Sequence, residues 1–468
     1  MVFSSATFIF IFLPLIMAIY LVTPKKFKNL VLFVSGLLFY AWGEFAYVYF
    51  ILITTVVDFV CGFLIDKYRE QFKKKKLFLL TSLIINFGLL SVFKYSGFVV
   101  STINAVFKTS IPDPNLPLPI GISFYTFCSA TYVLDVYMTR AGVEKSFIDY
   151  ASYVTMFPKV LMGPIVQYGQ IRGELKSRTV SFDKISYGTV LFIQGLAKKM
   201  LLSDTVGALW FTIKGLPVNE LSVGMAWLGI LAYAFNIYLD FSGYTDMARG
   251  LGYMLGFEFP INFDYPYLAV SISDFWRRWH ITLGSWFREY IYIPLGGNRV
   301  SKAKNIRNLL VVWMLTGLWH GASWNFVLWG LYFGILLIFE KFFFARILDK
   351  LPIFVRRIYS FFLILIGWVL FDFSEMSQMW KFFGAMFGAN GVGVLDGRFW
   401  YYVRGYALIF ILCITCSGGL FKRAGEWIRE RFKSMYIIGE PIVYISLFLI
   451  CISYLVEATN TPFLYFKF

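Results

Sequence analysis

Long apolar runs follow one another along almost the whole chain, and they limit its fold more than any other feature of the sequence. An α-helix needs about 20 apolar residues to cross the hydrocarbon core of a bilayer. Runs of adequate length lie at residues 6–22, 28–43, 46–65, 77–100, 119–138, 186–202, 222–241, 306–319, 322–344, 354–373, 403–420 and 436–456. The pattern predicts an all-α, polytopic integral membrane protein with about 11 to 13 transmembrane helices. We expect a single transmembrane domain over residues 1–468.

Composition excludes the soluble alternatives. The chain has 468 residues, of which 59% are hydrophobic and only 15% are charged. Soluble domains contain about 45–50% apolar and about 25% charged residues. The few charged side chains could not cover the exterior of a soluble protein of this length, so the partner implied for most of the surface is the lipid bilayer.

Two stretches in the middle of the chain are apolar but interrupted by proline. Residues 150–168 contain Pro158 and Pro164, and residues 244–272 contain Pro260 and Pro266. Broken segments at membrane depth are tolerated where they are buried in protein or line a wet cavity. The sequence therefore predicts re-entrant pieces in its middle third, where a functional site would lie.

The distribution of Lys and Arg predicts the orientation in the membrane. The net charge is +16, and the basic residues gather in short segments between the apolar runs, notably 67–76, 298–307 and 421–433. Cytoplasmic loops carry an excess of Lys and Arg, so we expect these three segments to be cytoplasmic and the nearly uncharged loop 110–119 to be outside. The same bias explains the charge without nucleic acid as a partner, and it indicates a bacterial inner or plasma membrane.

Metal and nucleotide chemistry find no support in the sequence. Cys413 and Cys416 form a CxxC within an apolar run, with no second pair and no neighbouring His, and we expect no metal site. No GxGxxG, P-loop or HExxH motif is present. We expect no bound cofactor.

The chain has only two histidines, His280 and His320, and both lie in polar-aromatic stretches. Each could be a structural hydrogen-bonding residue between helices, or a base that works near neutral pH. His320 lies between Gly317 and Gly321, which would leave the backbone open to close approach by another group. Asp240 and Asp246 are further candidate carboxylates in the stretch YLDFSGYTDMARG, and we interpret them as structural partners of Arg249.

Two longer motifs surround the histidines. They are WRRWHITLGSWFREYIYIPLGGNR at 276–299 and TGLWHGASWNFVLWGLYFG at 316–334. They resemble the membrane-bound O-acyltransferase family, and most of all its alginate O-acetylation branch, because the teichoic-acid D-alanylation branch lacks the YIPLGGNR element. Further stretches of the resemblance are ISFYTFCSATYVLDVY at 122–137, MFPKVLMGPIVQY at 156–168, YLDFSGYTDMARGLGYMLGF at 238–257 and the ending NTPFLYFKF.

The resemblance implies a ring of tilted helices around a thin centre pierced by a tunnel. It also implies O-acyl transfer, with His320 as the catalytic histidine and His280 as the second active-site position. The donor would be cytoplasmic acetyl-CoA, and the acceptor an extracytoplasmic glycan such as an exopolysaccharide or peptidoglycan. An SGNH-type extracytoplasmic transferase or esterase would be a partner if transfer is relayed.

Other side chains near His280 and His320 are candidates for holding the two substrates. Trp279 and Trp319 could position the donor or acceptor, and Arg277 and Arg278 could hold the phosphates of coenzyme A. Positive-inside bias explains the two arginines equally well.

Three other readings remain open from the sequence. The chain could be a transporter or flippase for a lipid-linked glycan, which would also be polytopic and basic. It could transfer D-alanine to teichoic acid. It could be a structural scaffold for an extracellular enzyme, which would tolerate loss of both histidines. A transporter needs no base at His280 and His320, so their pairing in aromatic, Gly-flanked motifs favours acyl transfer.

Overall fold

The computed structural model describes residues 1–457 and residue 463, and within them every regular element is a helix. The all-α prediction is therefore confirmed for the described residues. The closing stretch 460–468 that contributed to the family resemblance lies outside them, apart from Phe463. The chain divides into two compact units, residues 1–192 with 244–261 and residues 193–243 with 262–468. We describe each unit separately.

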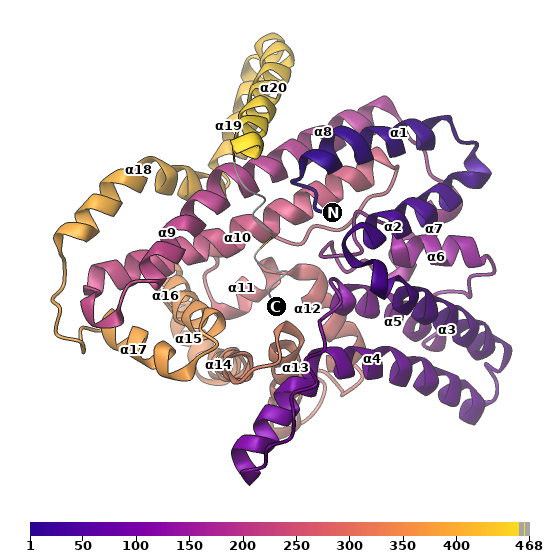
Figure 1. The fold of residues 1–468 in the computed structure, drawn as a ribbon, viewed down its shortest axis with the longest axis horizontal. Coiled ribbons are helices and arrows are strands. Elements are labelled where there is room, and N and C mark those ends of the chain that lie inside the picture. The colour runs from indigo at the N-terminus through magenta and orange to yellow at the C-terminus, as the bar shows by residue number, and fades with distance from the viewer. Residues whose placement is uncertain (458–462, 464–468) are drawn as a thin grey trace. The chain divides into compact units, whose positions relative to one another are not determined.

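Unit 1 is built from helices of the first third of the chain (Figure 1). They are α1 (Leu13–Val22), α2 (Lys28–Glu44), α3 (Val48–Lys67), α4 (Phe72–Phe107), α5 (Ile122–Tyr137), α6 (Phe147–Thr155) and α7 (Tyr168–Lys176), with α8 (Phe182–Ala197) and α10 (Val223–Met254) each divided between the two units.

A buried carboxylate connects three helices of unit 1. Asp58 of α3 accepts hydrogen bonds from Ser82 Oγ (2.5 Å) and Asn86 Nδ2 (2.7 Å) of α4 and from Ser129 of α5. Polar side chains at membrane depth are costly unless partners satisfy them, and satisfied ones hold helices together. We interpret this cluster as structural.

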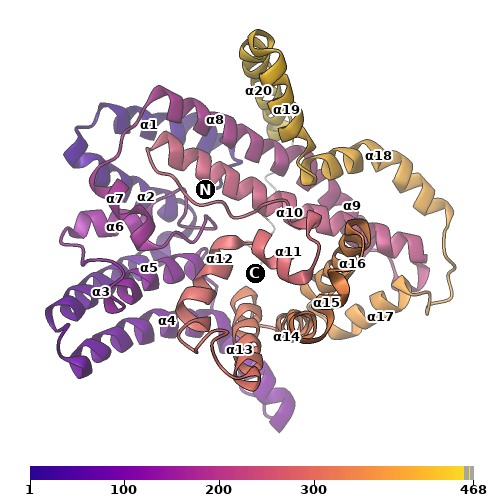
Figure 2. The same ribbon diagram turned by 180° about the vertical axis from the view of Figure 1, so that it is seen from behind.

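Unit 2 contains the remaining helices, seen from the opposite side in Figure 2. They are α9 (Asp204–Lys214), α11 (Ile272–Arg278), α12 (Ile281–Phe287), α13 (Lys302–His320), α14 (Trp324–Phe339), α15 (Ala345–Leu348), α16 (Ile353–Asp372), α17 (Met376–Met386), α18 (Gly397–Ser417), α19 (Leu420–Arg431) and α20 (Lys433–Glu457).

The proline-interrupted stretches are broken as expected. Helix α6 ends at Thr155, and the chain then runs without helix to Gln167, through Pro158 and Pro164. Helix α10 ends at Met254, and irregular backbone with one short 3₁₀ turn at Pro266–Leu268 leads to α11. Proline has no backbone N–H to continue a helix, which explains the loop through Pro158 and Pro164. Helix α10 ends before Pro260, where Gly256 adopts a φ of 90°.

Several described segments are long and apolar enough to cross a membrane. There are seven: Lys25–Lys67, Phe72–Phe107, Val223–Met254, Trp324–Leu348, Ile353–Asp372, Gly397–Ser417 and Lys433–Val456. The first contains both α2 and α3, and other predicted runs form shorter helices, such as the 16-residue α5. A multi-pass membrane protein is thus confirmed, whereas the count of about 11 to 13 crossings and the central tunnel stay predictions.

Helix α19 joins the two transmembrane candidates α18 and α20, and it has no buried residue. Its apolar side chains Leu420, Phe421 and Trp427 are exposed. Lys422 and Arg429 belong to a charged face of the same helix. This pattern is typical of interfacial helices, so we expect α19 to lie in the plane of the membrane interface with its apolar face in the lipid.

The orientation predicted from the basic segments can be tested by cysteine labelling. In a background without native cysteines, Gln71→Cys and Glu426→Cys should react with a membrane-impermeant maleimide only after the cells are broken open. Leu116→Cys, in the nearly uncharged loop, should react in intact cells. Labelling of residue 71 or 426 in intact cells would reverse the orientation that follows from the positive-inside rule.

Candidate active site

His280 lies in the short link between α11 and α12, in an unusual backbone conformation. Its φ is 45° and its ψ is 51°, which is the left-handed region that non-glycine residues seldom adopt. Asn262 holds this turn: its backbone oxygen accepts from the N–H of Ile281 (3.0 Å), and its Oδ1 accepts from the N–H (3.1 Å) and Oγ1 (3.0 Å) of Thr282. Such strained residues persist where the surrounding structure fixes them, and they cluster at functional sites.

The contacts of Asn262 also determine which nitrogen of His280 carries the proton. The backbone N–H of Thr282 can only donate, so the amide atom facing it is an oxygen. The same Oδ1 lies 3.2 Å from Nδ1 of His280, and Nδ1 must therefore donate to it. In the neutral ring Nε2 then carries the lone pair and can accept a hydrogen bond or a proton.

Burial keeps this imidazole neutral. The side chain of His280 is 1% exposed, and desolvation lowers its pKa from 6.5 to about 3. At neutral pH the ring is uncharged and fixed by Asn262.

The helix before His280 is anchored by a buried glutamate. Glu340, just after α14, accepts from the backbone N–H groups of Ile272 (2.7 Å) and Ser273 (3.0 Å) at the start of α11. A carboxylate is favourable there because the first N–H groups of a helix lack intrahelical acceptors. The contact fixes α11, and hence the turn that carries His280, against α14.

His320 is the last residue of α13 and is 2% exposed. Its ring contacts those of Trp319, Trp329 and Phe371 edge-to-face, with ring centroids 4.9, 4.9 and 5.2 Å away. Asn325 fixes part of this aromatic wall, since its Nδ2 donates to the backbone oxygen of Phe371 (2.9 Å). Helices α13, α14 and α16 therefore meet at this imidazole.

The glycines beside His320 serve helix packing. A Cβ atom on Gly317 would lie 2.3 Å from the backbone oxygen of Phe326, and one on Gly321 would lie 2.0 Å from the ring of Phe326. The expectation that these glycines admit a foreign group is thus corrected, because Phe326 occupies the space. Close contact between Gly317 and Gly330 lets α13 and α14 lie side by side (Figures 1 and 2).

The two histidines lie together in unit 2. Their ring centroids are 6.5 Å apart, and Trp319 contacts both rings, with centroid distances of 5.5 Å to His280 and 4.9 Å to His320. Phe241 of α10 also packs edge-to-face on His280, with ring centroids 4.7 Å apart. The chain thus folds back over the 39 residues between the two histidines to form one aromatic-walled site.

Of the other predicted site residues, Trp319 contacts both histidine rings. Trp279 is buried, and its ring packs against Phe263 and Trp368. Arg277 and Arg278 form ion pairs with aspartates.

The side chain of Arg277 is 73% exposed and lies 3.7 Å from Asp274. Arg278 is paired with Asp274 (3.1 Å) and Asp264 (3.7 Å). Neither guanidinium therefore belongs to the site around the imidazoles, and a contact with coenzyme A phosphates stays a prediction.

Asp240 and Asp246, which we interpreted as structural partners of Arg249, both form ion pairs, but Asp240 pairs with a different basic residue. Asp246 lies 3.6 Å from Arg249 on the same helix. Asp240 lies 2.8 Å from Lys199, whose Nζ also bonds Asp204 (2.7 Å). These pairs neutralise charge inside the protein.

Sequence reasoning missed Asn262, Trp329 and Phe371. Asn262 lies 18 residues before His280, in a loop without a recognisable motif. Phe371 is one of many aromatic residues in the chain. Neither Asn262 nor Phe371 is marked by a local sequence pattern, because each contributes through a contact that forms only in the tertiary fold.

The chain is similar to a known protein family and to several named proteins. A family model described as MBOAT, membrane-bound O-acyltransferase family, matches residues 34–371, which include both histidines. A protein named "Probable alginate O-acetylase AlgI" from Azotobacter vinelandii is 37% identical over 394 residues, covering 83% of this chain and 78% of that protein.

The printed names of two further relatives refer to other cell-surface polymers. The "Peptidoglycan O-acetyltransferase" of Helicobacter pylori is 34% identical over 430 residues, covering 84% of this chain and 81% of its own. The "Teichoic acid D-alanyltransferase" of Bacillus subtilis is 28% identical over 284 residues, covering 54% of this chain and 69% of its own.

Proposed function

Because the chain belongs to the membrane-bound O-acyltransferase family, we propose that it moves an acetyl group from cytoplasmic acetyl-CoA across the membrane to a glycan hydroxyl outside. The family and the acetyltransferase relatives establish an O-acyltransferase in a multi-pass membrane protein. The acetyl donor, the route across the bacterial membrane and the glycan acceptor are the proposed part. Transfer to the glycan is direct or passes through an SGNH-type partner protein.

The observation that carries the proposal is the pair of buried imidazoles with one shared aromatic wall. His320 is the proposed general base. It takes the proton of the acceptor hydroxyl as that oxygen attacks the thioester carbonyl carbon, and the protonated imidazole then gives the proton to the departing thiolate of coenzyme A as the C–S bond breaks. No other reactant is consumed.

His280 is proposed to orient the acceptor. Since its Nδ1–H is used by Asn262, its Nε2 can accept a hydrogen bond from a neighbouring hydroxyl of the acceptor, which leaves the proton of the attacking hydroxyl to His320. This keeps the oxygen lone pair directed at the carbonyl, and such orientation is a large part of catalysis.

The aromatic walls would suppress the competing reaction of the thioester with water. Phe371, Trp319 and Trp329 are buried around His320. Excluding water protects a reactive acyl donor from hydrolysis. The Nε1–H of Trp329 is buried and has no hydrogen-bond acceptor among residues 1–457 and 463, so we propose that it donates to the carbonyl oxygen on which negative charge develops.

Acyl transfer fits this site better than transport does. The curated relatives named above are transferases, and a flippase has no use for an imidazole whose tautomer is fixed. D-alanyl transfer has the weaker support, since that relative covers only 54% of the chain.

The proposal is tested with the purified chain in sealed vesicles. Labelled acetyl-CoA is supplied on the side of the basic segments 67–76 and 421–433, and a bacterial glycan on the other side, with and without a soluble SGNH-type domain. We expect acetyl esters on the glycan, detected by mass spectrometry, in at least one of the two reactions. Intact acetyl-CoA and unmodified glycan in both would refute acetyl transfer.

A further inference from the structure

One continuous helical stretch contributes a lysine to the surroundings of each histidine. Helix α8 continues through a π-helical turn at Lys198–Ser203 into α9, which ends at Lys214. From Ile193 on, this stretch belongs to unit 2, and it lies beside α10 (Figures 1 and 2). Lys199 and Lys214 are about four helical turns apart on it. Their ammonium groups therefore reach two different places in unit 2.

Lys214 holds the end of α16. Its Nζ pairs with the carboxylate of Asp372 and donates to the backbone oxygen of the same residue (3.1 Å). Trp210, one turn earlier on α9, donates from Nε1 to that carboxylate (3.2 Å). The last carbonyl groups of a helix lack intrahelical donors and carry partial negative charge, so an ammonium group is favourable there. Lys214 thus satisfies a helix C-terminus and a buried carboxylate together.

The residue before Asp372 forms part of the wall of His320. The ring of Phe371 packs edge-to-face on that imidazole, with ring centroids 5.2 Å apart. Asn325 Nδ2 donates to the backbone oxygen of Phe371 (2.9 Å). Because Phe371 and Asp372 share a planar peptide unit, fixing the backbone of Asp372 also restricts that of Phe371. The ion pair of Lys214 is therefore connected to the placement of one aromatic ring on His320.

Lys199 has the corresponding arrangement beside His280. Its Nζ lies 2.8 Å from Asp240 of α10 and 2.7 Å from Asp204. The side chains of Lys199 and Asp240 are 3% and 1% exposed. The residue after Asp240 is Phe241, whose ring packs on His280 with centroids 4.7 Å apart. At each histidine, a buried aspartate next in the chain to the phenylalanine on the imidazole is paired with a lysine of the same helical stretch.

Stability alone does not require ion pairs at these two places. Burying two charges costs desolvation energy, and apolar residues of similar volume are often at least as stabilising. A satisfied buried pair does, however, hold the attached backbone in one position. Precise placement of reacting groups is a large part of catalysis, so a fixed backbone has a use beside each imidazole.

We propose that the two lysines are positioning residues, one for each histidine. Lys214 acts on His320 through the end of α16, and Lys199 acts on His280 through α10. The kinetic consequences rest on the proposed function, because they use the roles proposed there for the two histidines. The connection of each lysine to one imidazole does not depend on those roles.

The first test uses nuclear magnetic resonance on the full chain in lipid nanodiscs, with isotope-labelled histidine. The chain has two histidines, and the variants His280→Asn and His320→Gln assign their ring signals. The chemical shifts of imidazole protons depend on the aromatic rings that pack on the imidazole. Lys214→Gln should therefore move the signals of His320 more than those of His280, and Lys199→Gln should do the reverse.

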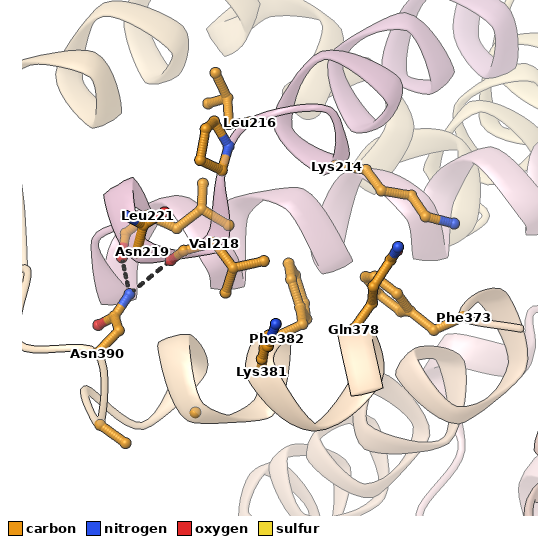
Figure 3. A pocket seen from close by; sticks show the side chains of 13 residues that line it. Lys214, Leu216, Val218, Asn219, Leu221, Phe373, Gln378, Lys381, Phe382 and Asn390 are labelled. Carbon is orange, nitrogen blue, oxygen red and sulfur yellow. Dashed lines mark hydrogen bonds between the residues drawn. The ribbon is translucent and has the colours of Figure 1, made fainter. Parts of the chain in front are cut away.

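Lys214→Gln is expected to fold. The Lys214 side chain is 29% exposed, and with Phe373 it lines a cavity of about 630 Å³ between α17 and the connection from α9 to α10 (Figure 3). This space accommodates a changed side chain, including the larger guanidinium of Lys214→Arg.

A second variant covers the buried pair, because Lys199→Gln leaves two carboxylates without their cation and is expected to lower stability. Asp240→Asn keeps an amide oxygen beside the ammonium group of Lys199. It leaves that group with the one carboxylate of Asp204, so the charges balance. This variant should also move the signals of His280 more than those of His320.

The matched control is Lys184→Gln. Lys184 lies on α8, its side chain is also 29% exposed, and it pairs with Glu258 of unit 1 (2.8 Å). Its loss removes an ion pair from the same helical stretch. The signals of both histidines and the rate of acyl transfer should stay as in the parent protein.

Steady-state kinetics of acyl transfer, measured per folded protein, give the second readout. Lys214→Gln should lower kcat by about three- to tenfold and leave the KM for the glycan unchanged, since a displaced base slows the chemical step. Asp240→Asn should raise the KM for the glycan by a similar factor, because His280 is proposed to orient the acceptor. Lys214→Arg, which keeps the cation, should restore kcat. A purely structural role would change the amount of folded protein and neither constant.

The inference is overturned if the signals of both histidines move equally in the lysine variants, if neither moves, or if Lys184→Gln moves them as much. Unchanged kcat and KM in an active protein would overturn it as well. A parent protein that gives the expected resonance pattern but transfers no acetyl group refutes the proposed function and leaves the positioning contacts intact. The two failures are therefore distinguishable.

Discussion

His320→Gln is expected to lower the rate of acyl transfer by about 10²–10⁴-fold, which is the contribution that general-base catalysis makes. Gln has nearly the volume of His, so it fills the space between Trp319, Trp329 and Phe371, but it cannot accept the hydroxyl proton. His320→Ala should lose as much activity and some stability as well, because it leaves a cavity. The measurement is acetyl transferred per folded protein.

Phe371→Leu is the matched control for the loss of packing. It disturbs the same aromatic wall without removing a base, and its rate should fall less than about tenfold. If His320→Gln keeps more than about a tenth of the parent rate, His320 is not the general base. His280, whose Nε2 can also accept a proton, would then be the candidate.

Gly317→Ala should destabilise the protein, because the space between α13 and α14 does not admit a methyl group. The new Cβ would lie 2.3 Å from the backbone oxygen of Phe326 and 3.2 Å from Cα of Gly330. Neither neighbour is a flexible side chain, so α13 and α14 must separate. Overpacking of this kind costs about 1–3 kcal/mol. Because His320 ends α13, activity should fall with the melting temperature.

Gly405→Ala provides the control for this change. Gly405 is also inside a helix, α18, and an added Cβ meets nothing within 4 Å. Alanine is the better helix former, so this variant should melt at or slightly above the parent temperature and keep full activity. A Gly317→Ala protein that melts like the parent would show that the helix contact does not limit stability.

The sequence predicted those parts of the molecule that depend on local pattern. Apolar runs identify helices because each run of about 20 residues must meet lipid or other helices. Proline marks the irregular stretch after Thr155, since Pro158 and Pro164 lack the N–H that a helix needs. Helix α10 instead ends at Met254, before Pro260, where Gly256 adopts a φ of 90°. The two histidines stood out because titratable groups inside a membrane protein are rare.

The remainder of the site depends on contacts between distant segments. Asn262 fixes the tautomer of His280, Glu340 fixes α11, and Phe371 covers His320. Each is an ordinary residue in its local sequence. Arg277 is part of the histidine motif in sequence, but its side chain is 73% exposed and pairs with Asp274, and its role towards the donor stays a prediction.

The left-handed backbone at His280 has a consequence for the use of mutant libraries on this protein. Any residue placed at position 280 must adopt a φ near 45°, which glycine and asparagine do readily and β-branched residues do not. The activities measured in a saturation library at position 280 will therefore depend on how readily each residue adopts the left-handed backbone, as well as on the chemical groups of its side chain. His280→Asn isolates the lost imidazole, whereas His280→Val measures mainly the conformational penalty, and the two rankings should not be combined into one score for catalytic importance.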